Sequence, residues 1–280
     1  MIELKNQLAG ELHTDYRTRL LYATDASAYR EVPRAVVYPK NKSDIKQVIN
    51  WAAANKSSVI PRTAGTSLAG QVVGGGVVVD VSRYLTNVIE LNKNERWVKV
   101  EPGVILDELN MLLEPDNLFF GPETSTSSRC MMGGMVGNNS CGSHSIIYGT
   151  TRDHTLEIEA VLSDGSEVVF KDITKSEFDA KCSLESLEGD IYRHIRNELS
   201  DPDVQKRIHE HYPEPSIYRR NTGYAIDLLL NTDVFGGTQL FNWVKVLAGS
   251  EGTLAFTTAI KLNLVETPPP VKGLVCAHFE

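Results

Sequence analysis

The sequence predicts a fold of mixed helices and strands, of the α+β class. Three observations indicate this. Residues from about 34 to 85 alternate strand and helix patterns, two later segments have the pattern of β-hairpins, and residues from about 175 to 245 are charged and helical. Because this helical stretch interrupts a strand-rich part of the chain, we expect it to be a helical insertion or a surface for another domain.

The first predicted unit runs strand–helix–strand–loop–strand over residues from about 34 to 85. Ser43 is expected to cap its helix, and Asp44 lies favourably for the helix dipole. The apolar residues of this helix recur at helical spacing: Ile45, Val48, Ile49 and Ala52. The strand "SSVIPR" then enters a glycine-rich loop, and the strand "GVVVDVSRY" leaves it with an apolar run that indicates burial on both faces.

The elements that follow are mostly strands. "VIELNKNERWVKVEPG" is expected to form a hairpin, "VILDELNMLLE" a helix, and "DHTLEIEAVLSDGSEVVF" a second hairpin that turns at Asp164-Gly165. In the insertion, "SLESLEGDIYRHIRNELS" is amphipathic through Leu184, Leu187, Ile191 and Ile195. "GSEGTLAFTTAIKLNLV" returns to strand composition, and "VKGLVCAHFE" has the pattern of one more strand, so we expect the chain to be the front piece of something longer.

Composition narrows the class of protein. Of the 280 residues, 41% are hydrophobic and 23% are charged, as in soluble globular proteins. The net charge of −8 argues against a nucleic-acid partner, and no apolar run is long enough to span a membrane. No secretory signal is visible. The cysteines, at positions 130, 141, 182 and 276, include no C-x-x-C pair, so we expect no metal site and reduced thiols in a cytoplasmic protein, free or peripheral to the inner membrane.

The stretch "PRTAGTSLAGQVVGGG" at residues 61–76 contains two glycines, Gly65 and Gly70, at the spacing that opens a P-loop. A P-loop continues with Lys and then Ser or Thr, which neutralise the terminal phosphates and hold magnesium. Gln71 and Val72 stand there instead. The loop therefore has the backbone of a phosphate site without the cation that nucleoside triphosphate chemistry requires.

A second glycine-rich segment, "GPETSTSSRCMMGGMVGNNSCGSHSIIYGTTRD", occupies residues 121–153. Such a stretch offers amide N–H groups and short polar side chains rather than a packed core. Two segments of this kind, both without Lys, suit a large ligand with a buried diphosphate. The dinucleotide fingerprint G-x-G-x-x-G after a strand is absent, which disfavours a Rossmann enzyme.

Three motifs, in order along the chain, resemble the FAD-binding domain of the vanillyl-alcohol-oxidase type, also named after p-cresol methylhydroxylase. They are "RTAGTS" at residues 62–67, "MGGMVGNN" with "YGTTRD" at residues 132–139 and 148–153, and "GSEGTL" at residues 249–254. The resemblance implies a non-Rossmann α+β domain of two subdomains that clasp FAD. Many relatives attach the flavin through a His at the position of Thr66, so the resemblance implies non-covalent FAD here.

The resemblance also implies an organisation and a set of cofactor-binding residues. The expected parts are an N-terminal helical segment (1–33), FAD-binding subdomain 1 (34–85), FAD-binding subdomain 2 (86–266) with its insertion, and the start of a truncated C-terminal cap domain (267–280). The residues expected to bind FAD are Pro61, Arg62, Ala64, Gly65, Thr66, Ser67, Leu68, Gly70, Gln71, Pro122, Thr124, Gly133, Gly134, Gly137, Asn138, Asn139, Ser140, Gly142, Tyr148, Gly149, Gly252 and Thr253.

Within that family, "RRNTGYAIDLLL" and "GSEGTLAF" look most like the FAD-linked D-2-hydroxy-acid dehydrogenases. This branch oxidises D-lactate, glycolate or D-2-hydroxyglutarate by hydride transfer to the flavin, which passes electrons to an acceptor such as an iron–sulfur domain or subunit. Its substrate-binding histidines belong to the cap domain. We therefore expect this chain to bind FAD and to turn over D-2-hydroxy acids poorly or not at all.

Arg220, Asn221 and Tyr224 are the candidates for reaching an anionic substrate, and a charged surface of the insertion is an equal alternative. His144, His154, His209 and His211 are expected to be structural or surface residues, with no metal ligated. Two other functions stay open: an FAD-binding and electron-transfer module without its own catalysis, and a flavin reductase like UDP-N-acetylmuramate dehydrogenase.

Overall fold

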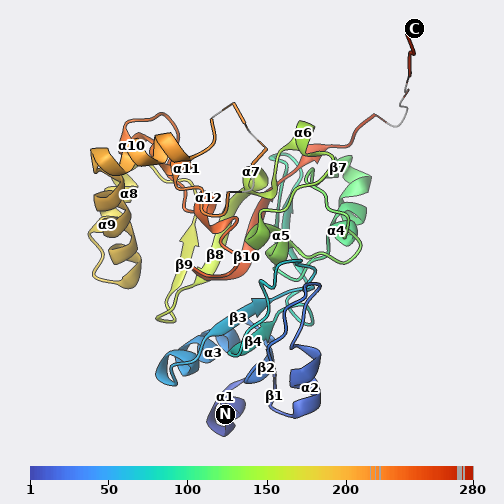
Figure 1. Ribbon diagram of the computed structural model, residues 1–280, viewed down its shortest axis with the longest axis vertical. Coiled ribbons are helices and arrows are strands. Elements are labelled where there is room, and N and C mark those ends of the chain that lie inside the picture. The colour runs from blue at the N-terminus through green and yellow to red at the C-terminus, as the bar shows by residue number, and fades with distance from the viewer. Residues whose placement is uncertain (215, 218, 221, 270–272, 274, 280) are drawn as a thin grey trace.

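The computed structural model describes residues 1–280 except 215, 218, 221, 270–272, 274 and 280, and it has two lobes (Figure 1). The first lobe, at the bottom of Figure 1, contains a four-stranded sheet in the order β1-β2-β4-β3. The second lobe contains a five-stranded sheet in the order β5-β6-β10-β8-β9. The α+β prediction is confirmed.

The first lobe comprises α1 (Ile2–Gln7), β1 (Glu11–His13), α2 (Tyr16–Leu21), β2 (Ala35–Tyr38), α3 (Lys42–Ala54), β3 (Val59–Arg62) and β4 (Val77–Asp80). Strand β4 lies between β2 and β3 and is parallel to both, with Val78 paired to Val36 and Ile60. Its valines are fully buried, which confirms the burial expected for "GVVVDV".

Two details of the first lobe differ from the sequence prediction. Helix α3 begins at Lys42 and its N-cap is Asn41, not Ser43, because Asn41 Oδ1 accepts a hydrogen bond from the Asp44 amide at 3.0 Å. The N-terminal segment, expected to be helical, also contributes strand β1, which pairs antiparallel with β2. A strand of three residues is too short for its alternation to be recognised in the sequence.

The second lobe comprises β5 (Val88–Asn92), β6 (Trp97–Val100), α4 (Leu106–Leu113), the 3₁₀ turn η1 (Glu114–Asp116), β7 (Leu118–Phe119), α5 (Met132–Asn138), α6 (Ser145–Tyr148), α7 (Thr151–His154), β8 (Thr155–Val161), β9 (Glu167–Phe170), β10 (Phe256–Asn263) and β11 (Val265–Glu266). Both predicted hairpins, β5–β6 and β8–β9, are confirmed. Strand β10 lies between them, antiparallel to β6 and β8, and so brings residues from the end of the chain into the middle of the sheet.

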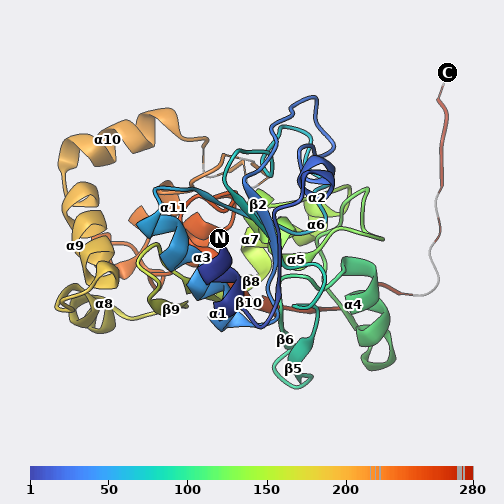
Figure 2. The same cartoon turned by 90° about the horizontal axis from the view of Figure 1, so that it is seen from below.

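The insertion is formed by α8 (Lys175–Cys182), α9 (Leu187–Leu199), α10 (Pro202–His211), α11 (Asp227–Leu230), the 3₁₀ turn η2 (Asp233–Phe235) and α12 (Val244–Leu247). Helices α8, α9 and α10 project from one side of the second lobe, opposite α4 (Figure 2). Phe178 of α8 and Tyr192 of α9 contact each other, and both pack against Phe241, which precedes α12. Leu184, predicted to lie on the apolar face, precedes α9 and is exposed.

Among the described residues that follow β11, the structure has no further helix or strand. The strand expected over residues 271–280 lies partly outside the described residues, and the described ones, 273 and 275–279, form no strand. Among the residues that the structure describes, no helix combines the length and the apolar character that a membrane crossing requires.

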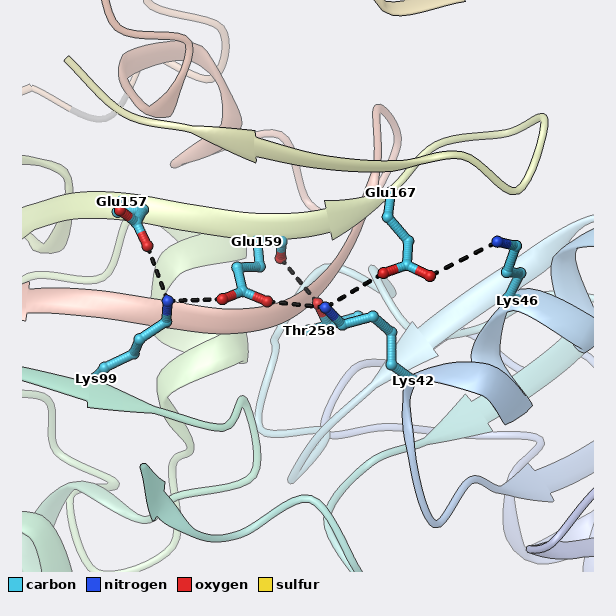
Figure 3. A network of polar contacts seen from close by, with 7 residues as sticks. All are labelled: Lys42, Lys46, Lys99, Glu157, Glu159, Glu167 and Thr258. Atoms are coloured by element: carbon cyan, nitrogen blue, oxygen red, sulfur yellow. Dashed lines mark hydrogen bonds and ion pairs between the residues drawn. The ribbon is translucent and has the colours of Figure 1, made fainter. Parts of the chain in front are cut away.

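A network of charged side chains joins the lobes (Figure 3). Glu159, on β8, accepts from Lys42 of α3 at 2.9 Å and from Lys99 of β6 at 2.6 Å. Lys42 and Lys46 also pair with Glu167 of β9. Because Lys42 and Lys46 belong to the first lobe and the carboxylates to the second, these ion pairs fix α3 against the edge of the larger sheet.

We expect Glu159→Gln to lower the free energy of unfolding by about 1 kcal/mol at neutral pH. Burial raises the pKa of Glu159, but hydrogen bonds from Lys99 and Lys42 outweigh it and hold the pKa below its usual value. A lowered pKa in the folded state stabilises the protein above the unfolded-state pKa, and this contribution is lost as the pH falls through the folded-state value. Urea unfolding at a series of pH values should therefore show the two proteins converging in acid.

Glu266→Gln is the matched control, because the Arg96–Glu266 pair is more exposed and lies away from the junction of the lobes. Its effect on unfolding should be smaller than that of Glu159→Gln. Equal effects of the two substitutions would contradict a stabilising role for the network.

Candidate cofactor-binding site

A cavity of about 540 Å³ lies between the two lobes. Its walls come from three separate parts of the chain, which lie around β3, around α5 and between α12 and the start of β10. These are the three segments in which the sequence predicts cofactor-binding residues. The fold therefore brings the three motifs to one place.

The first glycine segment forms one wall as an irregular loop after β3. Gly65 has φ = +67°, and a Cβ there would lie 2.7 Å from the Arg62 guanidinium, so the loop requires glycine at this position. Arg62 donates to the Thr24 carbonyl at 3.0 Å and lies over the Tyr22 ring. The backbone N–H groups of residues 65–68 have no hydrogen-bond partner among the described residues, so they are free to bind an anion.

Helix α5, from the second glycine segment, forms the facing wall. Gly134 lies so close to the first loop that a Cβ would be 2.6 Å from Thr63 Oγ1. At Gly137 a Cβ would meet only the Cα of Glu251, at 3.8 Å. The missing side chain at Gly137 therefore leaves room that the protein itself does not fill.

Asn139 ends α5 in the left-handed conformation, with φ = +48°. Its side chain is 3% exposed and lines the cavity. Oδ1 accepts from the backbone N–H of Arg152 at 2.9 Å, whereas Nδ2 has no partner among the described residues. A buried amide donor without a partner is costly, which indicates that a ligand completes it.

The third wall is the turn between α12 and β10. The amides of Gly249 and Glu251 donate to the carbonyls of Val136 and Gly137, both at 2.9 Å, and so attach this turn to α5. Across the mouth of the cavity, Gln71 Nε2 lies 3.2 Å from Glu251 Oε1. This hydrogen bond connects the loop of the first lobe directly to the turn of the second.

Most of the predicted FAD-binding residues line this cavity. The ones brought together are Pro61, Arg62, Gly65, Thr66, Ser67, Leu68, Gln71, Thr124, Gly133, Gly134, Gly137, Asn138, Asn139, Ser140 and Gly252. Thr253 lines a smaller neighbouring cavity of about 240 Å³, which shares Pro61, Gly252, Ala255 and Phe256 with the first.

Six predicted residues lie outside both cavities: Ala64, Gly70, Pro122, Gly142, Tyr148 and Gly149. For two of the glycines, contacts within the protein explain why a glycine stands there. At Gly70 a Cβ would meet the ring of Tyr29 at 2.7 Å, and at Gly149, where φ = +71°, it would meet the Asp153 carboxylate. Tyr148 packs edge-on against Phe119.

Of the catalytic candidates, Arg220 and Tyr224 do not line the cavity, and Tyr224 contacts the turn that forms the third wall. Arg220 is paired with Asp227 at 2.5 Å, so its charge is already neutralised. Tyr224 shares a hydrogen bond with Thr253 through the two hydroxyls, 2.5 Å apart. Asn221 lies outside the described residues.

Sequence reasoning missed part of the lining. Several missed residues are neighbours of predicted ones and could have been found by extending the motifs. Pro102 and the residues at the start of β10 could not, because nothing in the sequence around them indicates a binding site. The missed residues are Thr63, Ala69, Val72, Val81, Pro102, Ser125, Thr126, Cys130, Met131, Met135, Val136, Cys141, Leu247, Ser250, Glu251, Ala255, Phe256 and Thr257.

The histidine at position 154 is structural, as predicted: it is buried, and its ring nitrogens contact the Tyr148 carbonyl at 2.6 Å and Asn263 at 3.3 Å. His144 is exposed and lies 3.1 Å from Glu123. Burial raises the pKa of the Cys130 thiol, which accepts from the Thr124 hydroxyl. The described residues contain no group of three side chains suited to hold a metal ion.

The site fits an FAD molecule on its own geometry. Free amides and short hydroxyls of the first loop can bind a diphosphate without a cation. The room beside Gly137 and the free donor of Asn139 suit a ring system with hydrogen-bond acceptors. The apolar residues Val72, Val136 and Leu247 supply the surface that a flat organic group requires.

Comparison with known proteins agrees with this geometry. Residues 33–171 match the family described as FAD binding domain. The chain is 36% identical over 263 residues to D-2-hydroxyglutarate dehydrogenase of Haemophilus influenzae, covering 92% of this chain and 25% of that protein. It is 31% identical over 150 residues to glycolate oxidase subunit GlcD of Bacillus subtilis, covering 52% of this chain and 32% of that protein. The chain thus spans about a quarter of the D-2-hydroxyglutarate dehydrogenase that it matches.

Solved structures show the same fold. Alkyldihydroxyacetonephosphate synthase superposes with a TM-score of 0.63 at 16% identity, over 95% of this chain and 43% of that chain. A second crystal form of the same enzyme gives 0.64. Residues 33–171 are thus matched to the FAD binding domain family, and the chain has the non-Rossmann fold of the p-cresol methylhydroxylase type, with FAD as its cofactor.

Proposed function

We propose that this chain is the FAD-binding portion of an oxidoreductase that takes a hydride from the CH–OH group of a D-2-hydroxy acid. D-lactate, glycolate and D-2-hydroxyglutarate define the substrate class. The observation that carries the proposal is the cavity between the lobes, whose free amides, missing side chain at Gly137 and unpaired Asn139 donor suit FAD. The names of the relatives support the substrate class.

In this proposal the first glycine loop binds the diphosphate of FAD through the amides of residues 65–68. Asn139 and the room beside Gly137 hold the flavin half, and Gly252 and Thr253 border the smaller cavity, into which the cofactor extends. Bound FAD supplies a hydride acceptor that no side chain provides. With Thr66 in the first loop, we propose that FAD is held without a covalent bond.

A second candidate is an FAD-binding and electron-transfer module without its own catalysis. Among the described residues, the main cavity is lined by one cation, Arg62, and its guanidinium is engaged by Thr24 and Tyr22. The other candidate for a substrate carboxylate, Arg220, is paired with Asp227. The described site thus offers no free cation to a substrate, which favours this candidate.

We further propose an electron acceptor of the iron–sulfur class, in another domain or subunit, and a cytoplasmic location, free or peripheral to the inner membrane. The acidic composition and the absence of a disulfide among the four cysteines, all of which the structure describes, support the cytoplasmic location. The partner proposal is tested by reoxidation of the reduced flavin with an iron–sulfur protein under anaerobic conditions.

Anaerobic reduction of the FAD-loaded chain tests the enzymatic proposal. We expect D-2-hydroxyglutarate, D-lactate or glycolate to bleach the flavin absorbance slowly and stoichiometrically, and the L-enantiomers of the first two to have no effect. Dithionite gives the fully reduced reference. Bound FAD that none of the three acids reduces would favour the module, and bleaching by NADPH would favour a reductase instead.

A further inference from the structure

Arg152 is a buried cation next to the cavity that none of the predicted roles uses. It lies on α7, directly behind Asn139, and is 3% exposed. Its Nε and Nη2 donate to the Ala248 carbonyl at 3.0 and 2.6 Å, and Nη2 also donates to the Gly223 carbonyl at 2.7 Å. Among the described residues, no carboxylate lies within ion-pair distance of this guanidinium.

Burial is the main cause that lowers the pKa of Arg152 to about 10, and repulsion from Arg220 adds to it. The side chain therefore stays protonated at neutral pH. The guanidinium donates its hydrogen bonds to neutral carbonyls, and the charges of Asp153 and Asp227 nearby only partly offset the cost of burying it. This energetic cost indicates that Arg152 has a role other than stabilising the fold.

The partners of Arg152 indicate that role. Ala248 begins the turn that forms the third wall of the cavity. Gly249 fits only without a side chain, since a Cβ would lie 2.7 Å from Arg152 Nη2. The backbone N–H of Arg152 donates to Asn139 Oδ1. Because that partner is a donor, the oxygen of Asn139 must face it, and the nitrogen is the atom left free.

From these contacts we propose that Arg152 is a positioning residue for FAD. Its guanidinium fixes the turn at residues 248–252, and the anchored α7 holds Asn139 with Nδ2 available as a donor to the cofactor. Arg152 acts through these groups and does not touch FAD itself. The proposal rests on FAD being the ligand of this cavity.

Titration of the purified chain with FAD, followed by quenching of flavin fluorescence, tests the proposal. Arg152→Gln should weaken binding by about tenfold, the scale of one lost preorganised hydrogen bond. Arg152→Lys should recover part of the affinity, because an ammonium group can reach one of the two carbonyls. Asn139→Ala should weaken binding to a similar extent as Arg152→Gln.

The double variant separates positioning from a general loss of stability. If Arg152 acts through Asn139, combining Arg152→Gln with Asn139→Ala weakens FAD binding less than the product of the two single effects. Arg193→Gln is the matched control, because Arg193 also donates to two carbonyls, of Cys182 and Leu184, but lies in the insertion. It should lower stability and leave FAD affinity unchanged.

The experiment distinguishes failure of the Arg152 proposal from failure of the FAD assignment. Wild-type affinity in folded Arg152→Gln, or fully multiplicative effects in the double variant, would overturn the proposal while leaving the family and the hydroxy-acid chemistry intact. If the wild-type chain itself bound no FAD, the cofactor assignment would fail first. If Arg152→Gln does not fold, Arg152→Lys and Asn139→Ala decide, and wild-type affinity in both would refute the role.

Discussion

Gly137→Leu is expected to weaken FAD binding by about 100-fold, which corresponds to about 3 kcal/mol of steric overlap. Gly137 belongs to α5 and lines the cavity, and a Cβ there would meet only Glu251, at an ordinary distance of 3.8 Å. A larger side chain therefore extends into space that the cofactor requires. Flavin fluorescence quenching gives the affinity, and thermal unfolding of the apoprotein gives the stability.

Two further variants serve as controls for this prediction. Gly137→Ala should fold at least as well as the wild type, because alanine favours a helix over glycine by up to about 1 kcal/mol. Gly133→Ala should instead destabilise the apoprotein, because its Cβ would lie 2.6 Å from Pro102 Cβ. Undiminished FAD affinity in Gly137→Leu would mean that the cofactor does not occupy the room beside α5.

The sequence predicted which segments meet at the cavity better than it predicted the details of the fold, for a physical reason. Glycine-rich segments can be recognised from the local sequence alone, so the segments around Gly65 and Gly134 could be chosen as candidate ligand-binding segments without a structure. The hairpins could also be predicted from local sequence, because alternating apolar and polar residues and, in the second hairpin, the Asp164-Gly165 turn define them. Each of these signals lies within a few residues of the feature it predicts.

The missed features depend on contacts between distant parts of the chain. Pro102 lines the cavity because it packs under Gly133, which no property of its own segment indicates. Strand β1 exists because it pairs with β2 far along the chain; Leu12 pairs with Val37 across 24 intervening residues. Arg152 was recognised as part of a motif, but its role became visible only with its two carbonyl partners, which lie 71 and 96 residues away.

Asp44→Ala is expected to lower the free energy of unfolding by about 3 kcal/mol, because it removes three charge-assisted hydrogen bonds between a buried carboxylate and backbone amides. Asp44 is 2% exposed, and its carboxylate accepts from the amides of Ala9, Gly10 and Lys40 at 2.8–2.9 Å. The sequence assigned it only to the dipole of α3, whereas the structure makes it the point where the N-terminal segment is attached. Thermal unfolding should show a fall in Tm of about 5 °C for a chain of this size.

Asp15→Ala is the matched comparison, because Asp15 also accepts from a backbone amide at a helix start, that of Thr18, but is exposed. The loss of this cap should cost about 1 kcal/mol. Asp44→Asn should fall between wild type and Asp44→Ala, since one oxygen remains to accept while the new NH₂ group faces backbone donors. A loss in Asp44→Ala no greater than in Asp15→Ala would show that the N-terminal segment is held mainly by the packing of Leu4 and the pairing of β1, with the buried carboxylate adding little.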